Sequence, residues 1–259
     1  MSTKGSLLTW ITTPLLLLAF FICWDAYVSV FQVSRFVLPP PLEVLKAFWG
    51  LLVTPSTWWH AAVTVYETLF GFVVATVFGV LLGALLAKIP LLERVLSPFI
   101  IATQVVPKVA LIPLFILWFG FGPTSKIVVA AVLAFFPIMA NTLLGFKSIE
   151  TGHRDVMLSL NATSGAHARF LELPASLPYI MSGMEVGIVL AIIGAVVGEY
   201  LGGNVGLGHL AVASLNSFQV DLLFATILLL TVIGFLLYLA VVGLKRWVIP
   251  WHQSSGQVV

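Results

Sequence analysis

The sequence has very few charged residues and almost no cysteine. Only 8% of its 259 residues are Asp, Glu, Lys or Arg, whereas 60% are hydrophobic and the mean hydropathy is +1.12. Soluble domains carry about 25% charged residues, so this composition excludes an ordinary water-soluble protein and predicts one surrounded by a bilayer. The single Cys23 excludes a disulfide framework and a cysteine-built metal site.

The sequence also lacks the motifs of nucleotide, hydrolytic and zinc sites. It contains no G-x-x-x-x-G-K-[ST], no G-x-S-x-G and no H-E-x-x-H. Its net charge of +2 comes from scattered basic residues, which argues against the clustered basic face of a nucleic-acid-binding protein. The chain is therefore predicted not to be an enzyme. Any transport that it performs has to be driven by another polypeptide or by an ion gradient.

Long apolar runs predict an all-α polytopic membrane protein. A run of about 20 apolar residues crosses the hydrocarbon core as a helix, since each residue rises about 1.5 Å. Six such runs predict six transmembrane helices: Leu7–Val30, Ala61–Ala87, Pro98–Phe119, Lys126–Phe146, Ile180–Tyr200 and Leu222–Leu244. Polar residues and prolines interrupt the third run. No linker long enough to separate two domains occurs, so a single transmembrane domain over residues 1–259 is predicted.

The distribution of basic residues predicts the orientation, because cytoplasmic loops carry an excess of Lys and Arg. With the N-terminus inside, the predicted cytoplasmic segments hold eight basic residues: Lys4, Lys88, Arg94, Lys147, Arg154, Arg169, Lys245 and Arg246. The opposite side holds three, which are Arg35, Lys46 and Lys126. Both termini are therefore predicted to be cytoplasmic, together with the polar segment between the fourth and fifth spans.

That polar segment is predicted to form a helical hairpin. Residues 150–160 suit a short helix with Thr151 as its N-cap, and Asn161 suits the left-handed residue that stops it. Ser164 is the predicted cap of a second helix, which Pro174 and Pro178 are expected to end. A loop this long is usually functional or disordered, and its composition is not that of a disordered segment. We therefore expect it to dock a soluble partner, with a plain solvated loop as the alternative.

The spacing within the hairpin carries a family resemblance. Asp155, Asn161 and the ending Leu171-Glu-Leu-Pro174 lie where bacterial ABC importer permeases have the acidic residue, the Gly and the apolar-x-Leu-Pro ending of their cytoplasmic loop. The segment thus resembles that loop. It departs from the pattern because Asp155 replaces Glu, Val156-Met157 replace Ala-Ala, and Asn161 replaces Gly.

Other stretches resemble one branch of these permeases, those for nitrate, sulfonates, taurine and pyrimidine precursors. The matching stretches are Leu38-Pro-Pro-Pro41, residues 110–122, Leu173-Pro-Ala-Ser-Leu-Pro-Tyr179, residues 194–201 and Gly206-Leu-Gly208. The resemblance implies the type I ABC importer permease fold in a bacterial inner (plasma) membrane. It implies three protein partners: a cytoplasmic ABC ATPase dimer, an extracytoplasmic solute-binding protein and a second permease copy. This chain would bind no cofactor, since ATP and Mg would lie on the ATPase.

The resemblance also assigns residues within the ATPase-docking loop at 147–178. By position they are Asp155, Val156, Met157, Leu160, Asn161, Gly165, Leu171, Leu173 and Pro174. The expected function is passage of a small solute, either a sulfonate-, nitrate- or taurine-like anion or a pyrimidine or thiamine precursor. The alternatives are an ion-coupled secondary transporter or channel subunit, which would need buried charged pairs or broken helices, and a polytopic membrane enzyme.

Polar side chains in or near the spans are candidates for the translocation pathway, because ionisable groups in a membrane are costly. The candidates are Gln104, Lys108, Asn141, Glu185 and Glu199. For the three charged residues, reaching interfacial water or forming an internal salt bridge is the competing interpretation.

Overall fold

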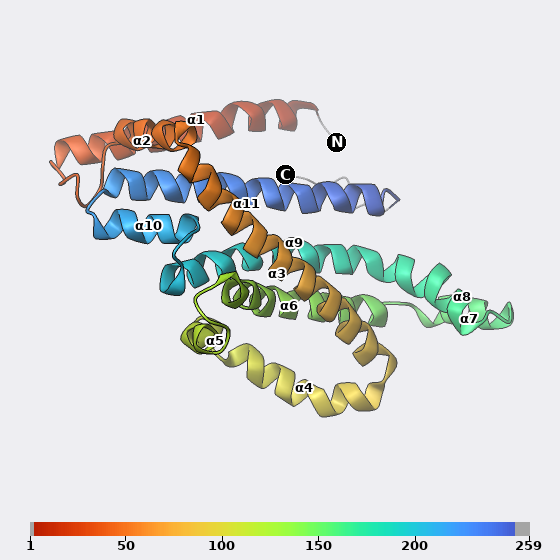
Figure 1. The fold of residues 1–259 in the computed structure, drawn as a ribbon. Coiled ribbons are helices and arrows are strands. Elements are labelled where there is room, and N and C mark those ends of the chain that lie inside the picture. The colour runs from red at the N-terminus through yellow and green to blue at the C-terminus, as the bar shows by residue number, and fades with distance from the viewer. Residues whose placement is uncertain (1–2, 252–259) are drawn as a thin grey trace. The chain divides into compact units, whose positions relative to one another are not determined.

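The computed structural model describes residues 3–251, and every regular element in that range is helical (Figure 1). The predicted all-α class is therefore confirmed. The described chain divides into two compact units, one formed by Met1–Trp59 with Leu210–Leu230 and the other by His60–His209 with Thr231–Val259. Helices α3, α10 and α11 each have residues in both units. The prediction of a single domain over residues 1–259, whose ends lie outside the described residues, stays a prediction.

The first unit contains two complete helices and parts of three others. Its elements are α1 (Thr3–Val30), α2 (Pro41–Val53), the start of α3 (Pro55–Lys88), most of α10 (Leu207–Asn216) and the start of α11 (Val220–Val248). Pro41 opens α2 at a position where a helix needs no N–H and where the fixed φ of proline is already helical. An ion pair of 2.7 Å joins Arg35 to Glu43 in the first turn of α2.

The second unit holds the remaining helices. These are α4 (Pro90–Val105), the 3-10 turn η1 (Lys108–Leu111), α5 (Ile112–Phe119), α6 (Pro123–Lys147), α7 (Thr151–Ser159), α8 (Ser164–His167), the π turn η2 (Ala168–Glu172) and α9 (Leu173–Gly202). Figure 1 shows α7 and α8 beyond the ends of α6 and α9.

Four helical segments are long and apolar enough to cross a membrane: α3, α6, the continuous stretch Ser164–Gly202, and α11. A bent pair formed by α4 and residues 108–119 makes a fifth candidate. The first predicted span lies in α1, of which Pro14–Val30 is a shorter apolar helix. The structure thus supports four to five spans.

The third predicted span, Pro98–Phe119, is wrong as a single straight helix. The chain turns by 84° between α4 and residues 108–119. Pro107 causes the break, because proline disfavours helical backbone in the residue before it, and Val106 is extended with ψ 127°. Among the residues of α4 none is buried.

Close packing of α6 on α9 forms the centre of the second unit. Small residues of α9 allow the approach, since a Cβ on Gly194 would lie 2.7 Å from Cα of Ala130 and one on Gly183 would lie 2.9 Å from Cβ of Asn141. Gly83 of α3 lies equally close to Thr142 of α6. Small side chains let backbones meet at van der Waals distance, which is the main source of helix association in lipid.

Candidate functional site

The hairpin between α6 and α9 turns at Asn161, as predicted. Asn161 has φ 50°, in the left-handed region, and it follows α7 at the position where glycine is usual. The amide of Asn161 donates to the carbonyl of Leu158 at 2.9 Å, and that of Ala162 donates to the carbonyl of Met157 at 3.0 Å. These two bonds make a Schellman motif, so the turn satisfies the last carbonyls of α7 without any partner protein.

The predicted caps of the hairpin helices are each displaced by one residue. Thr151 is the first helical residue of α7, and the N-cap position belongs to Glu150, which makes no side-chain cap bond. Thr163 caps α8 in place of Ser164, because its Oγ1 accepts the amide of Ala166 at 3.3 Å. At the start of α8 a hydroxyl residue occupies each of two adjacent positions, Thr163 and Ser164, and local sequence does not distinguish them.

The prediction that Pro174 and Pro178 end the second helix is wrong. The chain continues from α8 through the π turn η2 into α9, and Ser164–Gly202 forms one helical stretch of 39 residues. Pro174 lies in the first turn of α9, where its missing N–H costs little after the π turn has shifted the hydrogen-bond register. The second half of the hairpin is therefore continuous with a candidate membrane span, and a force applied to it acts on α9 directly.

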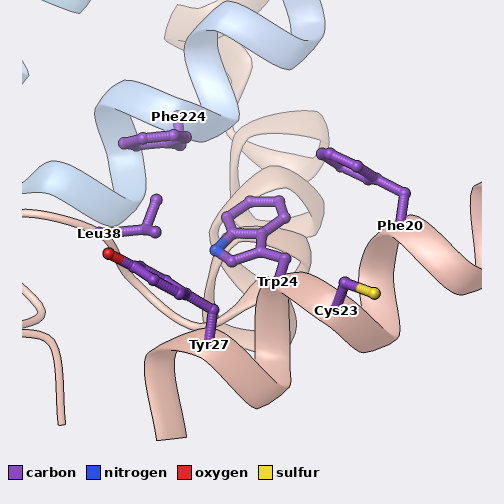
Figure 2. Close-up of a pocket in the computed structure, with 6 residues that line it drawn as sticks. All are labelled: Phe20, Cys23, Trp24, Tyr27, Leu38 and Phe224. Carbon is purple, nitrogen blue, oxygen red and sulfur yellow. The ribbon is translucent and has the colours of Figure 1, made fainter. Parts of the chain in front are cut away.

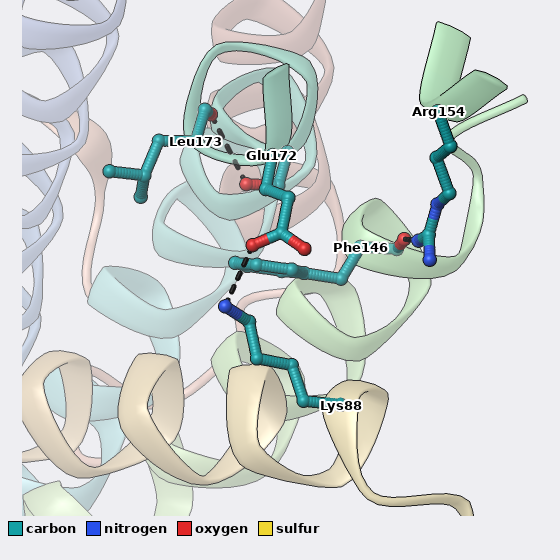
Figure 3. Close-up of polar contacts among 6 residues, drawn as sticks. Lys88, Phe146, Arg154, Glu172 and Leu173 are labelled. Carbon is teal, nitrogen blue, oxygen red and sulfur yellow. Dashed lines mark hydrogen bonds and ion pairs between the residues drawn. The ribbon is translucent and has the colours of Figure 1, made fainter. Parts of the chain in front are cut away.

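Polar contacts attach the hairpin to the ends of α3 and α6. Lys88 Nζ lies 2.7 Å from Glu172 Oε2, and the guanidinium of Arg154 donates to the carbonyl of Phe146 at 3.3 Å (Figure 3). The first contact joins the last residue of α3 to the π turn, and the second joins α7 to α6. Both orient the hairpin relative to α3 and α6.

The hairpin also exposes apolar side chains. Val156, Leu158, Leu160 and Phe170 are between 58% and 71% exposed. The resemblance assigned Val156 and Leu160 to the docking loop, but it gave no reason to select Leu158 or Phe170. The other residues assigned by resemblance lie on the same segment, with Asp155, Asn161, Gly165 and Leu173 exposed and Met157, Leu171 and Pro174 partly buried. Val156, Leu158 and Leu160 lie outside every candidate span, and exposed apolar side chains at such positions indicate an interaction surface.

Two pathway candidates lie at the break between α4 and α5. Gln104 is exposed on α4, and its backbone carbonyl accepts a hydrogen bond of 3.5 Å from Lys108 Nζ. The same ammonium lies 4.7 Å from the centroid of the Phe136 ring, a cation–π geometry. Within residues 3–251 no carboxylate lies in ion-pair range of Lys108.

The remaining candidates have partners inside the protein. The amide of Asn141 donates to the carbonyl of Pro137 at 2.9 Å. Glu185 forms an ion pair of 3.0 Å with Lys245, as the competing interpretation predicts. Glu199 is buried, where it accepts bonds of 2.6 Å from Thr64 Oγ1 and of 2.6 Å from the amide of Gly208.

Sequence reasoning missed two residues of the Glu199 environment. Glu67, three residues after the Thr64 that bonds Glu199, and Lys126, whose side chain lies against Gly198, are both buried. Glu67 is an ionisable residue within the second predicted span, so the rule that selected Lys108 would have selected it also. Lys126 was predicted to begin the fourth span on the extracytoplasmic side. It is the fourth residue of α6, and backbone carbonyls enclose its ammonium.

The first unit contains an apolar pocket of about 370 Å³, lined by Phe20, Cys23, Trp24, Tyr27, Leu38 and Phe224 (Figure 2). Trp24 Nε1 is buried there without a hydrogen-bond partner. The lining is apolar and aromatic and holds no carboxylate or basic group. Such a lining suits hydrocarbon and offers no acid–base chemistry.

Comparison with known proteins places these features in a family. The sequence model of the family described as "Binding-protein-dependent transport system inner membrane component" matches residues 75–251. The riboflavin transport system permease protein RibX of Chloroflexus aurantiacus is 36% identical over 241 residues, 93% of this chain and 90% of its own length. The formylaminopyrimidine transport permease protein ThiX of Halalkalibacterium halodurans is 33% identical over 85% of this chain and 88% of its own.

The similarity extends to more distant proteins. The taurine transport system permease protein TauC of Escherichia coli is 29% identical over 88% of this chain and 85% of its own length. Among solved structures, a chain of the MetNI methionine ABC transporter matches 82% of this chain and 98% of itself, with a TM-score of 0.59 and 21% identity. At that identity the match shows a common fold.

Proposed function

Since this chain belongs to the family of binding-protein-dependent transport system inner membrane components, we propose that it is the permease subunit whose two copies enclose the pathway of an ATP-driven importer. Family membership decides against an ion-coupled secondary transporter or channel subunit, and it explains why the chain has no ATPase motif of its own. The proposed partners are a cytoplasmic ABC ATPase dimer, which carries ATP and Mg, and an extracytoplasmic solute-binding protein.

The cytoplasmic hairpin carries this proposal. It exposes apolar side chains, it is the direct continuation of α9, and ion pairing attaches it to α3. A soluble ATPase that binds the hairpin would therefore move α9 and α3 together. In this mechanism ATP binding favours one of two conformations of the membrane helices, which is a population shift driven by the partner.

Substitution of Asp155 tests the docking role. Asp155 is exposed on α7 and makes no ion pair among the described residues, so Asp155→Lys leaves the fold of the hairpin intact. We expect it to detach the ATPase or to uncouple ATP hydrolysis from uptake. Glu150→Lys makes the same charge change at an exposed hairpin position outside the family pattern and serves as the control. Normal uptake and normal ATPase co-purification by Asp155→Lys would count against docking through this loop.

We further propose six spans with both termini in the cytoplasm. Helix α1 supplies the first span and the bent pair α4 with η1–α5 supplies the third. A bent span with no buried residue on α4 suits a position beside a second copy or a pathway, since broken helices in membranes occur where they line protein or water. Accessibility labelling of single cysteines placed at residues 46 and 155 distinguishes the two sides.

Residues near this break are the proposed pathway residues. Gln104 and Lys108 lie on it, and Asn141 lies on the same helix as Phe136, the ring beneath the lysine ammonium. Glu185 and Glu199, already bonded within the chain, would take part only after those contacts open.

For the solute, we propose a planar nitrogen heterocycle of the pyrimidine type. Relatives named for riboflavin and formylaminopyrimidine transport are 36% and 33% identical to this chain, whereas permeases named for aliphatic sulfonates and taurine are 29–32% identical. Proteoliposomes with the cognate binding protein and ATPase test this through competition between a labelled pyrimidine and taurine. Uptake inhibited by taurine alone would shift the assignment to a small sulfonate-type anion.

A further inference from the structure

Three ionisable side chains meet inside the second unit, away from the hairpin and from the helix break. Glu67 comes from α3, Lys126 from α6 and Glu199 from α9, and their exposed fractions are 2%, 2% and 1%. All three helices are candidate membrane spans. An isolated charge at such depth is expensive, so the cluster has to balance its charges internally.

Glu199 is held by donors on both oxygens. Oε1 accepts from Thr64 Oγ1 and Oε2 accepts from the amide of Gly208, each at 2.6 Å, while Thr64 Oγ1 itself accepts from the amide of Leu207 at 2.8 Å. Gly206 has φ +114° and leaves space for the Glu199 carboxylate, because a Cβ on Gly206 would overlap that carboxylate. This cradle stabilises the ionised form of Glu199 by hydrogen bonding.

Lys126 contributes its charge without forming an ion pair. Its ammonium donates to the backbone carbonyls of Phe121, Gly122 at 3.0 Å, and Gly202 at 2.7 Å. An ammonium has three N–H groups, and these three carbonyls use all of them. No carboxylate oxygen lies within ion-pair distance of Nζ in the described part of the chain.

Glu67 completes the cluster, and its burial favours a proton. Its Oε2 is buried and receives no bond from any N–H or hydroxyl of the described residues. Glu67 lies three residues after Thr64 on α3, and Thr64 Oγ1 donates to Glu199, so both glutamates lie at the same face of α3. An ionised carboxylate oxygen without a donor is costly to bury, whereas a protonated carboxyl is neutral and can itself donate a hydrogen bond. Counting charges gives the same answer, since two carboxylates and one ammonium sum to −1 and a single proton brings the sum to zero.

We propose that Glu67 and Glu199 form a proton-binding site that holds one shared proton, which makes the cluster neutral and links α3, α6, α9 and residues 206–208. The other titratable groups at this end of the unit are His60 and His209, whose rings stack at 6.3 Å. His60 Nδ1 accepts from the amide of Gly206 at 3.0 Å, so it shares the glycine segment with Glu199. The proposal concerns folding and proton binding, and it holds whichever solute is carried.

Loss of the proton leaves a buried net charge. Near neutral pH the folded protein therefore keeps a proton that the unfolded chain releases. By linkage, the free energy of unfolding falls as the pH rises. Glu67→Gln replaces the proton by a permanent amide donor, so with Glu199 ionised and Lys126 positive the cluster is neutral at every pH. In this variant the free energy of unfolding is expected not to fall at alkaline pH, and the fold is expected to be retained.

Infrared difference spectroscopy of the purified full chain in nanodiscs detects the proton itself. We expect a protonated-carboxyl C=O band that shifts in D₂O, disappears in Glu67→Gln and persists in Glu185→Gln, whose glutamate is ion-paired to Lys245. The band in the wild-type protein should also fade at alkaline pH, a test that needs no variant. Absence of such a band, or thermal stability that declines equally with pH in wild type and Glu67→Gln, would overturn the proposal.

Discussion

Lys88 and Glu172 form an ion pair of 2.7 Å that joins the last residue of α3 to the π turn leading into α9 (Figure 3). The glutamate side chain is 18% exposed and the lysine side chain 48%, so water screens the pair only in part. Lys147 and Glu93 make a similar pair of 2.6 Å between α6 and α4. Two ion pairs thus connect helices at the side of the unit where the hairpin begins.

Reversal of the first pair should weaken the attachment of the hairpin. Lys88→Glu places two carboxylates together and is expected to lower coupling of ATP hydrolysis to uptake, whereas Lys88→Glu with Glu172→Lys restores it. The pair itself should contribute about 0.2–1 kcal/mol, as partly exposed ion pairs do. A double-mutant cycle on thermal stability and on the transport-to-ATPase ratio measures this, and equal behaviour of the single and double variants would refute it.

The turn at Asn161 gives a prediction about backbone conformation. Because Asn161 has φ 50°, Asn161→Gly should be tolerated, while Asn161→Val should destabilise the turn by about 1–2 kcal/mol. The measurement is limited proteolysis of the hairpin together with ATPase co-purification. Glycine serves as the matched control, since both variants remove the same side-chain amide. If valine and glycine protect the hairpin equally, the left-handed turn is not required.

Local features of the sequence were sufficient to predict this turn, but not the helix that follows it. The left-handed position of Asn161 depends on one residue type, so it is visible in the sequence. Whether Pro174 ends the helix depends on whether a π turn precedes it, and nothing in the sequence of residues 168–172 predicts that turn. Pro107, by contrast, does break the predicted span in which it lies, because no π turn before it shifts the hydrogen-bond register of the helix.

Contacts between distant residues explain what else was missed. Glu67 and Lys126 belong to different helices, and only the packing of α3, α6 and α9 brings them to Glu199. Helical periodicity assigns a residue to a face, but it does not say which helix covers that face. The small residues of α9 form a packing face, and α6 of the same chain covers it.

That packing face gives a prediction about folding. A valine at Gly194 would drive its Cβ to 2.7 Å from Cα of Ala130, and backbone cannot move aside as a flexible side chain can. Gly194→Val should therefore separate α6 from α9 and sharply reduce the yield of folded protein. Gly243→Ala on α11, where no atom lies within 4 Å of the added Cβ, should leave it unchanged. Size-exclusion profiles and thermal melts in detergent compare the two, and a normal profile for Gly194→Val would contradict the packing.

Lys108 provides the test of the helix break as part of the pathway. Its ammonium contacts the carbonyl of Gln104 and the ring of Phe136, with no carboxylate of the described residues in ion-pair range, so it is available to a passing solute. Lys108→Met keeps the aliphatic stem but removes the charge and the cation–π contact, whereas Lys108→Arg keeps both. We expect methionine to lower the uptake rate while ATPase co-purification stays normal, and arginine to preserve most of the uptake. Unchanged uptake together with a lower melting temperature in Lys108→Met would show instead that the lysine only stabilises the end of α4.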